Sequence, residues 1–510
     1  MRFSPPLILT LLASAAPAPS ALAESAAVWP DNARIRDHIS AARTRRIAVV
    51  GLGDSNQLYN SVGWDDACTQ ALGHRYALWG TGLISFGESV GFGSSVGAGV
   101  ACHPAALSGG SLFQFGGAPR QLDALLSAPE VVPPSNYLYI PPGVETESRS
   151  PLNGLILTPL CGLELHTSAV TIHLTHGLFP SGLALRAWVS PYDPVQEPFA
   201  DFALKTQGAY GAATTSFVLP PGLSWGASRV WVGDERARCR GPFLGYYMQA
   251  EQPSRTTGAA FHTLFAKGGA SARDMAASLL NATDAQLTLF FSRVRAPLGP
   301  EPRVTVRIVT GVNDRSEGLP SAVNTISPGN SPAAFRDNIM GVVNRLRGLW
   351  ASNDWDAASE LRFVLAVSPP MGTPDDPSLI EYRSVLRSIA AHNPDTVALD
   401  FSQLVTPEEM LWRNWYEAGG LDRYHFTALG HAGLVERELE ALIRRDCWEP
   451  ADFDNSGEVN TRDLLGLLED FGRAVAPGQG ADASGDGAVN TADLALLLSK
   501  FGAPTCNASD

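Results

Sequence analysis

Apolar strands that stop at a short polar turn and lead toward a helix recur along this chain, and they restrict the kind of sheet it can form. The run "RIAVVGLG" from Arg46 is apolar and β-branched and ends in Gly53-Asp54-Ser55-Asn56. The run "RVTVRIVT" ends in Gly311-Val312-Asn313-Asp314 in the same way. The runs "LRFVLAVSP" from Leu361 and "TVALDFSQL" from Thr396 are further predicted strands.

Predicted helices lie between these strands. From Ser331 to Trp350 the apolar residues follow helical spacing and form one face: Phe335, Ile339, Val342, Leu346 and Leu349. Ser378 and Glu381 match a capping box that opens the next helix. Strands that alternate with helices predict a parallel sheet covered on both faces. The functional site is then expected at the carboxyl ends of the strands.

The N-terminus has the pattern of a secretory signal peptide over residues 1–23. Arg2 gives a positive start, "LILTLLASAA" is apolar but too short to cross a membrane, and Ala21 to Ala23 form a small-residue cleavage site. A buried N-terminal helix is the alternative. No later segment approaches the roughly 18 apolar residues of a membrane span. We therefore expect an exported protein that is released or held outside the cell by a partner.

Export to an oxidising compartment predicts that the six cysteines form disulfides. Six cysteines allow about 15 pairings, and sequence cannot choose among them. Neighbours along the chain are the preferred partners: Cys68 with Cys102, Cys161 with Cys239, and Cys447 with Cys506. The sequence contains neither Cys-x-x-Cys nor His-Glu-x-x-His, so a zinc site has no support.

A chain of 510 residues exceeds one ordinary core, so about two to four domains are expected. From about Val131 to Gln252 the pattern changes to short alternating runs between Pro/Gly turns, such as "AVTIHLTHG" and "LALRAWVSP". This pattern predicts an inserted antiparallel β-sandwich. Its general character resembles a jelly-roll carbohydrate-binding module. Five aromatic residues in it can stack on sugars, although such residues more often fill a sandwich core: Trp188, Trp225, Trp231, Tyr246 and Tyr247.

The acidic residues are concentrated at the C-terminus. The net charge is −14, and residues 446–510 contain twelve Asp or Glu against three Lys or Arg. Nucleic acid is an unsuitable partner for such a protein, because phosphate binding needs basic patches.

The acids of this tail belong to a duplicated pattern. "DFDNSGEVNTRDLLGLLEDFG" from Asp452 recurs as "DASGDGAVNTADLALLLSKFG" from Asp482. Both copies place oxygen side chains at loop positions 1, 3, 5, 9 and 12, with a turn-forming glycine at 6, as Ca²⁺ requires. Glu458 and Ala488 stand at position 7, where EF-hand loops use a backbone carbonyl. The predicted side-chain ligands are Asp452, Asp454, Ser456, Asn460 and Asp463, then Asp482, Ser484, Asp486, Asn490 and Asp493.

An apolar helix face follows each loop, and we expect the two faces to pack on each other: Leu464, Leu465, Leu468 and Phe471 against Leu494, Leu497, Leu498 and Phe501. The whole pattern, over about Cys447 to Cys506, resembles a dockerin. The resemblance implies calcium binding and docking onto a cohesin domain. Ser456 and Ser484 replace carboxylates often found in dockerins, which implies modest calcium affinity.

The positions that would contact a partner leave the partner of the tail open. Dockerins often contact their partner through loop positions 10 and 11, and these are Thr461 with Arg462 in one copy and Thr491 with Ala492 in the other. The two faces are therefore not identical. A metal-binding structural tail without a cohesin partner is the alternative.

A serine nucleophile needs a base within hydrogen-bond reach and a group that orients the base. Asp422 and His425 offer that pair, three residues apart ahead of a predicted helix. The strand ending at Ser55, the turn at Gly311-Val312-Asn313-Asp314 and this Asp-x-x-His together resemble the SGNH (GDSL-type) hydrolases. The resemblance implies a flavodoxin-like α/β three-layer sandwich.

The resemblance also implies roles for individual residues. Ser55 would be the nucleophile, His425 the base and Asp422 its orienting group. The oxyanion hole would consist of the Ser55 and Gly269 N–H groups and the Asn313 side-chain amide. Gly269 comes from a Gly-Ala-Ser turn that precedes a predicted helix. His431 is a rival base, and Gly268, Gly80 and Gly82 compete with Gly269.

We therefore predict a hydrolase domain split over 24–130 and 253–446, a β-sandwich at 131–252 and a dockerin-type domain at 447–506. The expected function is that of a secreted serine esterase without a catalytic cofactor, acting on acyl groups of a polysaccharide, most of all acetyl esters. The substrate expectation rests on the dockerin resemblance, because dockerins commonly accompany polysaccharide-degrading enzymes. The alternatives are a lipolytic or aryl esterase of the same fold and a non-catalytic carbohydrate-binding protein with a lapsed hydrolase core.

Overall fold

The computed structural model describes residues 27–30, 33–58, 64–76, 78–80, 84–85, 138–140, 155–159, 169–178, 185–190, 200–204, 207–208, 211–219, 229–233, 243–266, 270–315, 331–371, 376–417, 420, 422–443, 451–453, 459–475, 481–484 and 488–502. The predicted signal peptide at 1–23 lies outside these residues, as do Trp225 and every cysteine except Cys68. Among the described helices none is long and apolar enough to cross a membrane.

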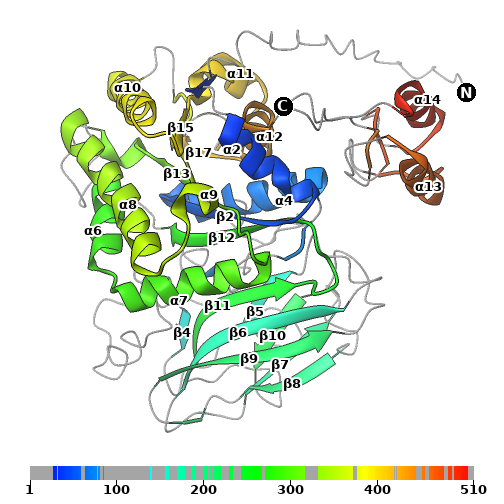
Figure 1. Cartoon of the computed structure of the whole chain (residues 1–510), viewed down its shortest axis with the longest axis horizontal. Helices are drawn as coiled ribbons and strands as arrows, with labels where there is room; N and C mark the ends of the chain where they lie inside the picture. Colours follow the sequence, from blue (N-terminus) through cyan, green and yellow to red (C-terminus); the bar gives the residue numbers. More distant parts are fainter. Residues whose placement is uncertain are drawn as a thin grey trace, which may run out of the picture.

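The centre of the molecule is a six-stranded sheet, shown in Figure 1. Its order is β1 (Val28–Trp29), β15 (Thr396–Leu399), β14 (Leu361–Val367), β13 (Val304–Thr310), β2 (Arg46–Gly53) and β12 (Gly258–Ala266). All neighbouring strands from β15 to β12 are parallel, and β1 closes one edge antiparallel. The inner strands are buried along almost their whole length, which explains their near-continuous apolar sequences. The predicted α/β architecture with a parallel sheet is confirmed.

Helices cover both faces of this sheet. One face packs against α2 (Ala33–Ser40), α4 (Trp64–Tyr76) and α12 (Ala428–Leu442). The other packs against α6 (Ala272–Asn281), α7 (Asp284–Arg295), α8 (Pro332–Ser352) and α10 (Pro377–Ala391). The predicted apolar face of α8 is buried at all five positions. Shorter helices complete the domain: η1 (Ala41–Arg43), α3 (Ser55–Leu58), η4 (Ala296–Leu298), η5 (Val312–Asp314), α9 (Ala357–Glu360), η6 (Phe401–Gln403) and α11 (Pro407–Trp412).

The start of α10 corrects one prediction. Asp376 is the N-cap and accepts the backbone N–H of Ser378 at 2.9 Å, so the predicted capping box of Ser378 and Glu381 is wrong. Pro377 explains the shift, because proline has no N–H and a fixed φ that suits the first helical position.

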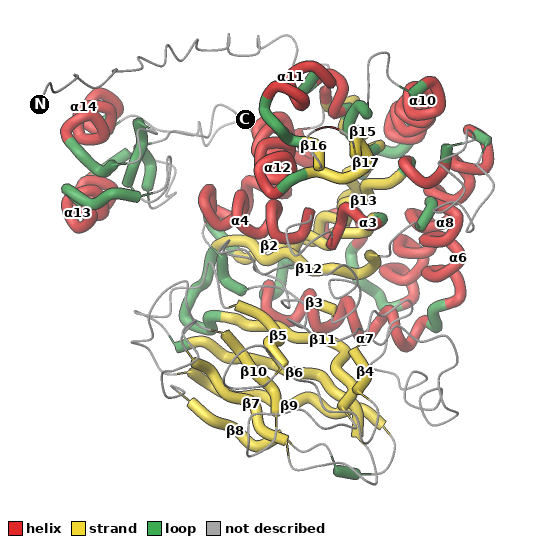
Figure 2. Tube along the Cα trace, turned by 180° about the vertical axis from the view of Figure 1, so that it is seen from behind, coloured by secondary structure: helices red, strands yellow, loops and turns green. Residues whose placement is uncertain are grey.

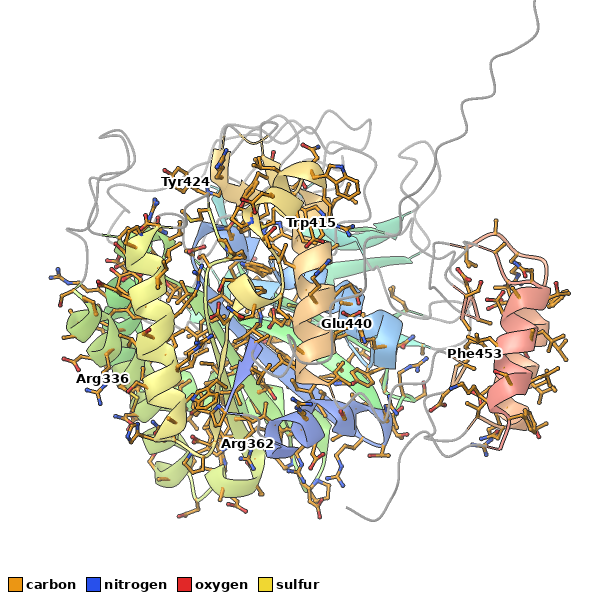
Figure 3. The ribbon with its side chains drawn as sticks, turned by 90° about the horizontal axis from the view of Figure 1, so that it is seen from above. Arg336, Arg362, Trp415, Tyr424, Glu440 and Phe453 are labelled. Atoms are coloured by element: carbon orange, nitrogen blue, oxygen red, sulfur yellow. The ribbon has the colours of Figure 1, made fainter. Side chains whose placement is uncertain are left out.

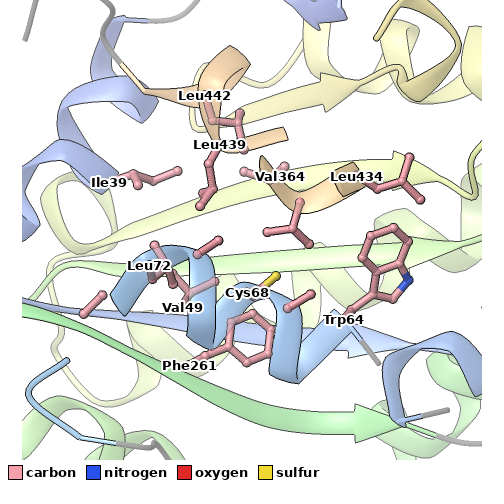
Figure 4. Packing of buried hydrophobic residues seen from close by; sticks show 14 of the residues in the cluster. Ile39, Val49, Trp64, Cys68, Leu72, Phe261, Val364, Leu434, Leu439 and Leu442 are labelled. Atoms are coloured by element: carbon pink, nitrogen blue, oxygen red, sulfur yellow. The ribbon is translucent and has the colours of Figure 1, made fainter. Parts of the chain in front are cut away.

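The predicted pairing of Cys68 with Cys102 stays a prediction, because Cys102 lies outside the described residues. Cys68 lies on α4, buried among the apolar side chains between the sheet and its helices. Figure 4 shows its sulfur in this core together with Val49, Leu72 and Phe261. The partners proposed for the other cysteines lie outside the described residues.

The segment between β2 and β12 contains two antiparallel sheets. One consists of β5 (Leu155–Pro159), β10 (Arg229–Gly233), β7 (Leu185–Ser190) and β8 (Ala200–Leu204). The other consists of β3 (Ile84–Ser85), β11 (Phe243–Glu251), β6 (Val170–Leu178) and β9 (Gly211–Leu219), with β4 (Leu138–Ile140) also on β11. The predicted antiparallel strands are present, while their packing as one sandwich and the domain boundaries stay predictions. β3 lies ahead of the predicted boundary at 131 and still joins this sheet.

The predicted sugar-stacking aromatic residues of this segment cannot be assigned to a core or a surface. Trp188 lies on β7, Trp231 on β10, and Tyr246 and Tyr247 on β11, but their side chains are outside the described part of the chain. Their role stays a prediction.

The tail folds as two similar loop–helix units, α13 (Thr461–Asp470) and α14 (Thr491–Lys500), drawn together in Figures 1 and 2. The Gly472 N–H donates to Val489 O and the Gly502 N–H to Val459 O, both at 2.8 Å, so the two repeats brace each other symmetrically. Their shared core consists of Ala451, Val459, Leu467, Ala481, Val489 and Leu497.

The predicted packing of the two tail helices is only partly correct. Leu497 is buried and Leu464 and Leu494 pack at the margin of the core. The other predicted residues, Leu465, Leu468, Phe471, Leu498 and Phe501, are 43–57% exposed. The physical reason is that Val459 and Val489 of the loops fill the space between the helices, so each ten-residue helix buries only one narrow stripe.

Candidate active site

The candidate nucleophile follows directly from the carboxyl end of β2. β2 ends at Gly53, and Ser55 is the first residue of α3. The Asn56 N–H donates to Asp54 Oδ1 at 2.9 Å, and the Gln57 N–H donates to Asp54 O at 3.1 Å, so Asp54 caps this short helix. The backbone of Ser55 is therefore held in a tight, capped turn. Its side chain is outside the described part of the chain.

A hairpin brings the candidate base to this turn. It consists of β16 (Tyr416–Glu417) and β17 (Asp422–Phe426), and β17 carries both Asp422 and His425. Asn56 Nδ2 donates to the carbonyl oxygen of Tyr424 at 2.9 Å. The residue after Ser55 is thus hydrogen-bonded to the residue before His425, and Figure 2 shows α3 beside β17. The Asp422 side chain lies outside the description.

Contacts from two further strand ends fix the hairpin. After β13, the Arg315 guanidinium stacks on the Tyr424 ring at 4.6 Å and donates from Nε to Val312 O at 2.8 Å. After β14, Pro370 O accepts the Tyr416 hydroxyl. The hairpin is therefore attached at the carboxyl ends of β2, β13 and β14, which share one edge of the sheet. Figure 3 shows Tyr424 and Trp415 at this end of the domain.

The predicted oxyanion-hole turn is assembled from two segments. Asn313 Nδ2 donates to Ala270 O at 3.0 Å, and both carboxylate oxygens of Asp314 accept the Ala272 N–H at 3.0 Å. The residues just after Gly269 are therefore attached to the Asn313 turn, although Gly269 itself lies outside the described residues. Gly311 opens this turn with φ +116°, where a side chain would be strained.

Gly80 competes with Gly269 for the predicted oxyanion-hole role, but a different structural feature explains why position 80 is a glycine. It bridges to Glu251 of the second antiparallel sheet, and a Cβ at this position would lie 2.7 Å from Ala250 O. Close backbone approach therefore requires glycine there. Gly82 and Gly268 lie outside the described part of the chain.

The two candidate bases have different surroundings. His431 lies on α12, is fully buried, and meets the rings of Trp64 and Phe426 edge-on at 5.0 and 5.5 Å. Burial lowers the pKa of His431 to about 3, so it stays neutral at physiological pH and is closed to solvent. His425 is only partly buried, on the strand beside α3. The geometry therefore favours His425 over its rival.

Charges surround the candidate serine. Burial raises the pKa of Asp54 to about 6, and the Asp314 carboxylate adds to the rise. The Asn56 N–H and the nearby His425 imidazole oppose it. Asp54 thus stands within electrostatic reach of both His425 and Asp314.

A buried ion pair holds α12, the helix that follows the hairpin. Arg307 on β13 donates from Nε and Nη2 to the two carboxylate oxygens of Glu438 on α12, each at 2.6 Å. Both side chains are almost fully buried, and the guanidinium lies 4.7 Å from the Trp64 ring. Two parallel charge-assisted bonds fix geometry as well as charge. The helix that follows the hairpin is therefore attached to a central strand of the sheet.

The described residues of the tail loops fit a hard cation. Asp452, Asp463, Asp482 and Asp493 are all buried, and buried carboxylates need compensating charge. Asp493 Oδ1 accepts the Ser484 N–H at 2.8 Å, which brings loop position 12 over position 3. Asp454, Ser456, Glu458 and Asp486 lie outside the description. Within the described part, no cluster of three or more His, Cys, Asp or Glu forms a metal site.

No protein-family model and no curated protein sequence matches the chain. Among solved structures it is similar to a peptidoglycan O-acetylesterase, with 12% identity, a TM-score of 0.43 and coverage of 81% of this chain and 95% of that one. A Bacillus subtilis protein shows 13% identity and a TM-score of 0.26, covering 55% and 78%. An acetyl xylan esterase from the rumen bacterium Butyrivibrio proteoclasticus shows 11% identity and a TM-score of 0.21, covering 60% and 97%. These similarities are too distant to assign an activity to this chain.

Three contributors to the site had no role in the sequence interpretation. Asn56 and Asp314 lie inside the quoted motifs, in which the roles were predicted for their neighbours Ser55 and Asn313. Arg315 directly follows Asp314 and gives no signal in the sequence, because its partners Val312, Asp376 and Tyr424 come from three separate segments. Only the fold brings them together.

Proposed function

We propose that this chain is a secreted serine esterase that hydrolyses carboxylic esters, above all acetyl esters on a polysaccharide. One observation carries the proposal: the hydrogen bond from Asn56 to the Tyr424 carbonyl, at 2.9 Å, sets the backbones of Ser55 and His425 next to each other. The joined turns at Ala270 and Asn313 add a site for negative oxygen at the same sheet edge.

The proposed reaction has two steps. In the first, Ser55 Oγ attacks the ester carbonyl, its proton passes to His425, and His425 gives that proton to the leaving alcohol. Water then attacks the acyl-serine, again with His425 as base, releasing the acid and restoring Ser55. Asp422 orients the imidazole and stabilises its charged form.

The oxyanion would form opposite the Ser55 and Gly269 N–H groups and the Asn313 amide. Asn313 Nδ2 carries two hydrogens, and Ala270 O takes one of them. The second hydrogen is available to the oxyanion. One such donor contributes about 3 kcal/mol to the transition state in other enzymes. The serine and the imidazole carry every proton in this sequence of steps, so the chemistry needs no cofactor.

The dockerin-like tail supports a polysaccharide substrate. Its buried carboxylates would hold one Ca²⁺ in each loop and fix the loop–helix units. A cohesin domain or another surface partner would then keep the enzyme near its substrate. The signal-peptide pattern at 1–23 supports export.

Acetate release from acetylated xylan or pectin tests the proposal. The wild-type chain should release acetate and Ser55→Ala should not; equal release by both would refute it. A series of p-nitrophenyl esters separates the lipolytic alternative, which predicts a preference for acyl groups beyond about eight carbons. Failure of a fluorophosphonate to label Ser55 would support the non-catalytic carbohydrate-binding alternative.

A further inference from the structure

Trp412 is the most exposed large apolar side chain among the described residues, at 73%. It is the last residue of α11. A buried tryptophan stabilises a core, whereas one this exposed leaves the broad apolar face of its indole in water. Exposure alone assigns no ligand, so its position and its neighbours decide what it can bind.

The position of Trp412 is the edge of the sheet that carries the candidate active site. α11 follows the carboxyl end of β15, which runs parallel to β14, β13 and β2. Two residues after Trp412, Asn414 O accepts the Thr427 hydroxyl at 3.0 Å, and Trp415 O accepts the Thr427 N–H at 2.8 Å. Thr427 is only two residues after His425. Trp412 is therefore on the same rigid edge as the candidate base.

The chain around Trp412 is fixed. Asn414, two residues after the last residue of α11, has φ +55°, and the Trp415 N–H donates to Met410 O at 2.9 Å. The neighbouring Leu411 packs so closely on Gly420 that a Cβ there would lie 2.7 Å from Leu411 Cδ2. The indole is thus presented by a closed turn, which lowers the entropy lost when a ligand binds.

The chemistry next to the indole favours a sugar over an acyl chain. The Arg413 guanidinium lies over one face of the Trp412 ring, 5.6 Å from its centroid, and donates to Glu409, which also accepts from Arg437. The other face of the indole is apolar with charged groups nearby, which matches a sugar ring with C–H groups on its face and hydroxyls on its rim. A long acyl chain would cover the Arg413–Glu409 ion pair without offering it hydrogen bonds, and removing an ion pair from water is costly.

We propose that Trp412 is a stacking platform for a sugar ring of the polysaccharide backbone, beside the ring whose ester is cleaved. This inference rests on the proposed esterase function and adds a binding subsite to it. Arg413 and Glu409 would contact the hydroxyls of the stacked ring. The subsite serves polymeric substrates and is not needed for a small ester that ends at the reacting carbonyl.

Binding without turnover provides the first test. The full chain carrying Ser55→Ala is run by affinity electrophoresis in gels containing soluble acetylated xylan. Adding Trp412→Ala should weaken retardation by about tenfold in apparent affinity, since the face of one tryptophan is lost. Trp412→Phe should fall between the two. The matched control is Leu280→Ala, because Leu280 is 54% exposed on α6 at the end away from Asp314, and it should change nothing.

Turnover provides the second test. With Ser55 intact, Trp412→Ala should lower kcat/KM for acetylated xylan about tenfold, mainly through KM, and leave p-nitrophenyl acetate within twofold. Equal binding and turnover with and without Trp412, or no retardation by the glycan at all, would overturn the subsite. A loss confined to long-chain p-nitrophenyl esters would overturn it in favour of an acyl-chain site. Failure of the esterase proposal gives a different result, since wild type and Ser55→Ala would then hydrolyse p-nitrophenyl acetate equally or not at all.

Discussion

Asn56 and Tyr424 are 368 residues apart in the chain and are joined by a hydrogen bond of 2.9 Å from the Asn56 amide to the Tyr424 carbonyl. This bond connects the turn after β2 to the hairpin that carries Asp422 and His425. The residues on either side of it, Ser55 and His425, are the proposed nucleophile and base. The relative position of the two proposed catalytic groups therefore depends on a side chain that has no role in the proposed chemistry.

Asn56→Ala should reduce activity more than stability. Loss of one hydrogen bond should cost about 1 kcal/mol of unfolding free energy, while a misplaced His425 should lower kcat for p-nitrophenyl acetate about tenfold to a hundredfold. Asn353→Ala is the control, because its amide donates to Leu349 O at 2.8 Å and to Thr288 Oγ1 at 3.0 Å at the end of α8, far from the hairpin in sequence. It should lose at least as much stability in urea and keep its kcat. Equal kcat values for the two variants would contradict this role of Asn56.

Removing one residue of the Arg307–Glu438 ion pair should lower the unfolding free energy more than removing both. Glu438→Ala leaves a buried guanidinium without its carboxylate, and such changes cost about 3–5 kcal/mol. The double variant Arg307→Met with Glu438→Leu removes both charges and should recover most of that loss. Urea unfolding of the single and double variants measures the coupling. A double variant no more stable than Glu438→Ala would contradict it.

The sequence could predict the fold better than the site, and the difference has a physical cause. Apolar strands such as Val304–Thr310 and the stripe of α8 are local patterns, and both appear as expected. The prediction of how the tail helices pack was partly wrong, because Val459 and Val489, which lie outside the helices, fill the space between them. The observed N-cap of α10 is Asp376 and not the predicted Ser378, because Asp376 followed by Pro377 favours a helix start there. In both of these wrong predictions, residues next to the local pattern decided the result.

In the candidate site, too, residues in local motifs could be predicted from the sequence, whereas contacts between distant segments could not. Ser55, His425 and Asn313 stand in motifs that the sequence reveals, and the structure brings their backbones or side chains to one edge. Arg315 and its stack on Tyr424 depend on contacts between distant segments. Nothing in the sequence near position 315 indicates such a contact. The burial of His431 likewise depends on a distant segment, because Trp64 of another helix packs on its ring.

The raised pKa of Asp54 predicts a pH-dependent contribution to stability. The pKa is about 6 in the folded chain, against the ordinary aspartate value of 3.8 in the unfolded chain, so between pH 4 and 6 the folded state keeps a proton that the unfolded state has lost. The folded state binds more protons in this window, and its stability falls as the pH rises through it. The loss is about 3 kcal/mol for a shift of this size.

Asp54→Asn isolates this contribution. The asparagine keeps an oxygen to accept the Asn56 N–H and cannot titrate. The difference in unfolding free energy between wild type and variant should change by about 3 kcal/mol from pH 4 to pH 8, in favour of the variant at high pH. Urea unfolding at several pH values gives this difference, in which the other titrating groups cancel. A constant difference over this range would show that Asp54 is ionised in both states.

Calcium should order the tail without affecting ester hydrolysis. The four buried carboxylates of the two loops repel one another when no cation is bound, so a chelator should lower the melting temperature of the tail, and added Ca²⁺ should restore it. Calorimetric titration of the chelated full-length chain should find two sites, and Asp493→Ala should remove one. Asp470→Ala is the control, because Asp470 pairs with Arg473 at 2.5 Å on α13, outside the predicted ligand set, and it should keep both sites. Loss of p-nitrophenyl acetate hydrolysis on chelation would place a required cation in the hydrolase domain and contradict the assignment of calcium to the tail alone.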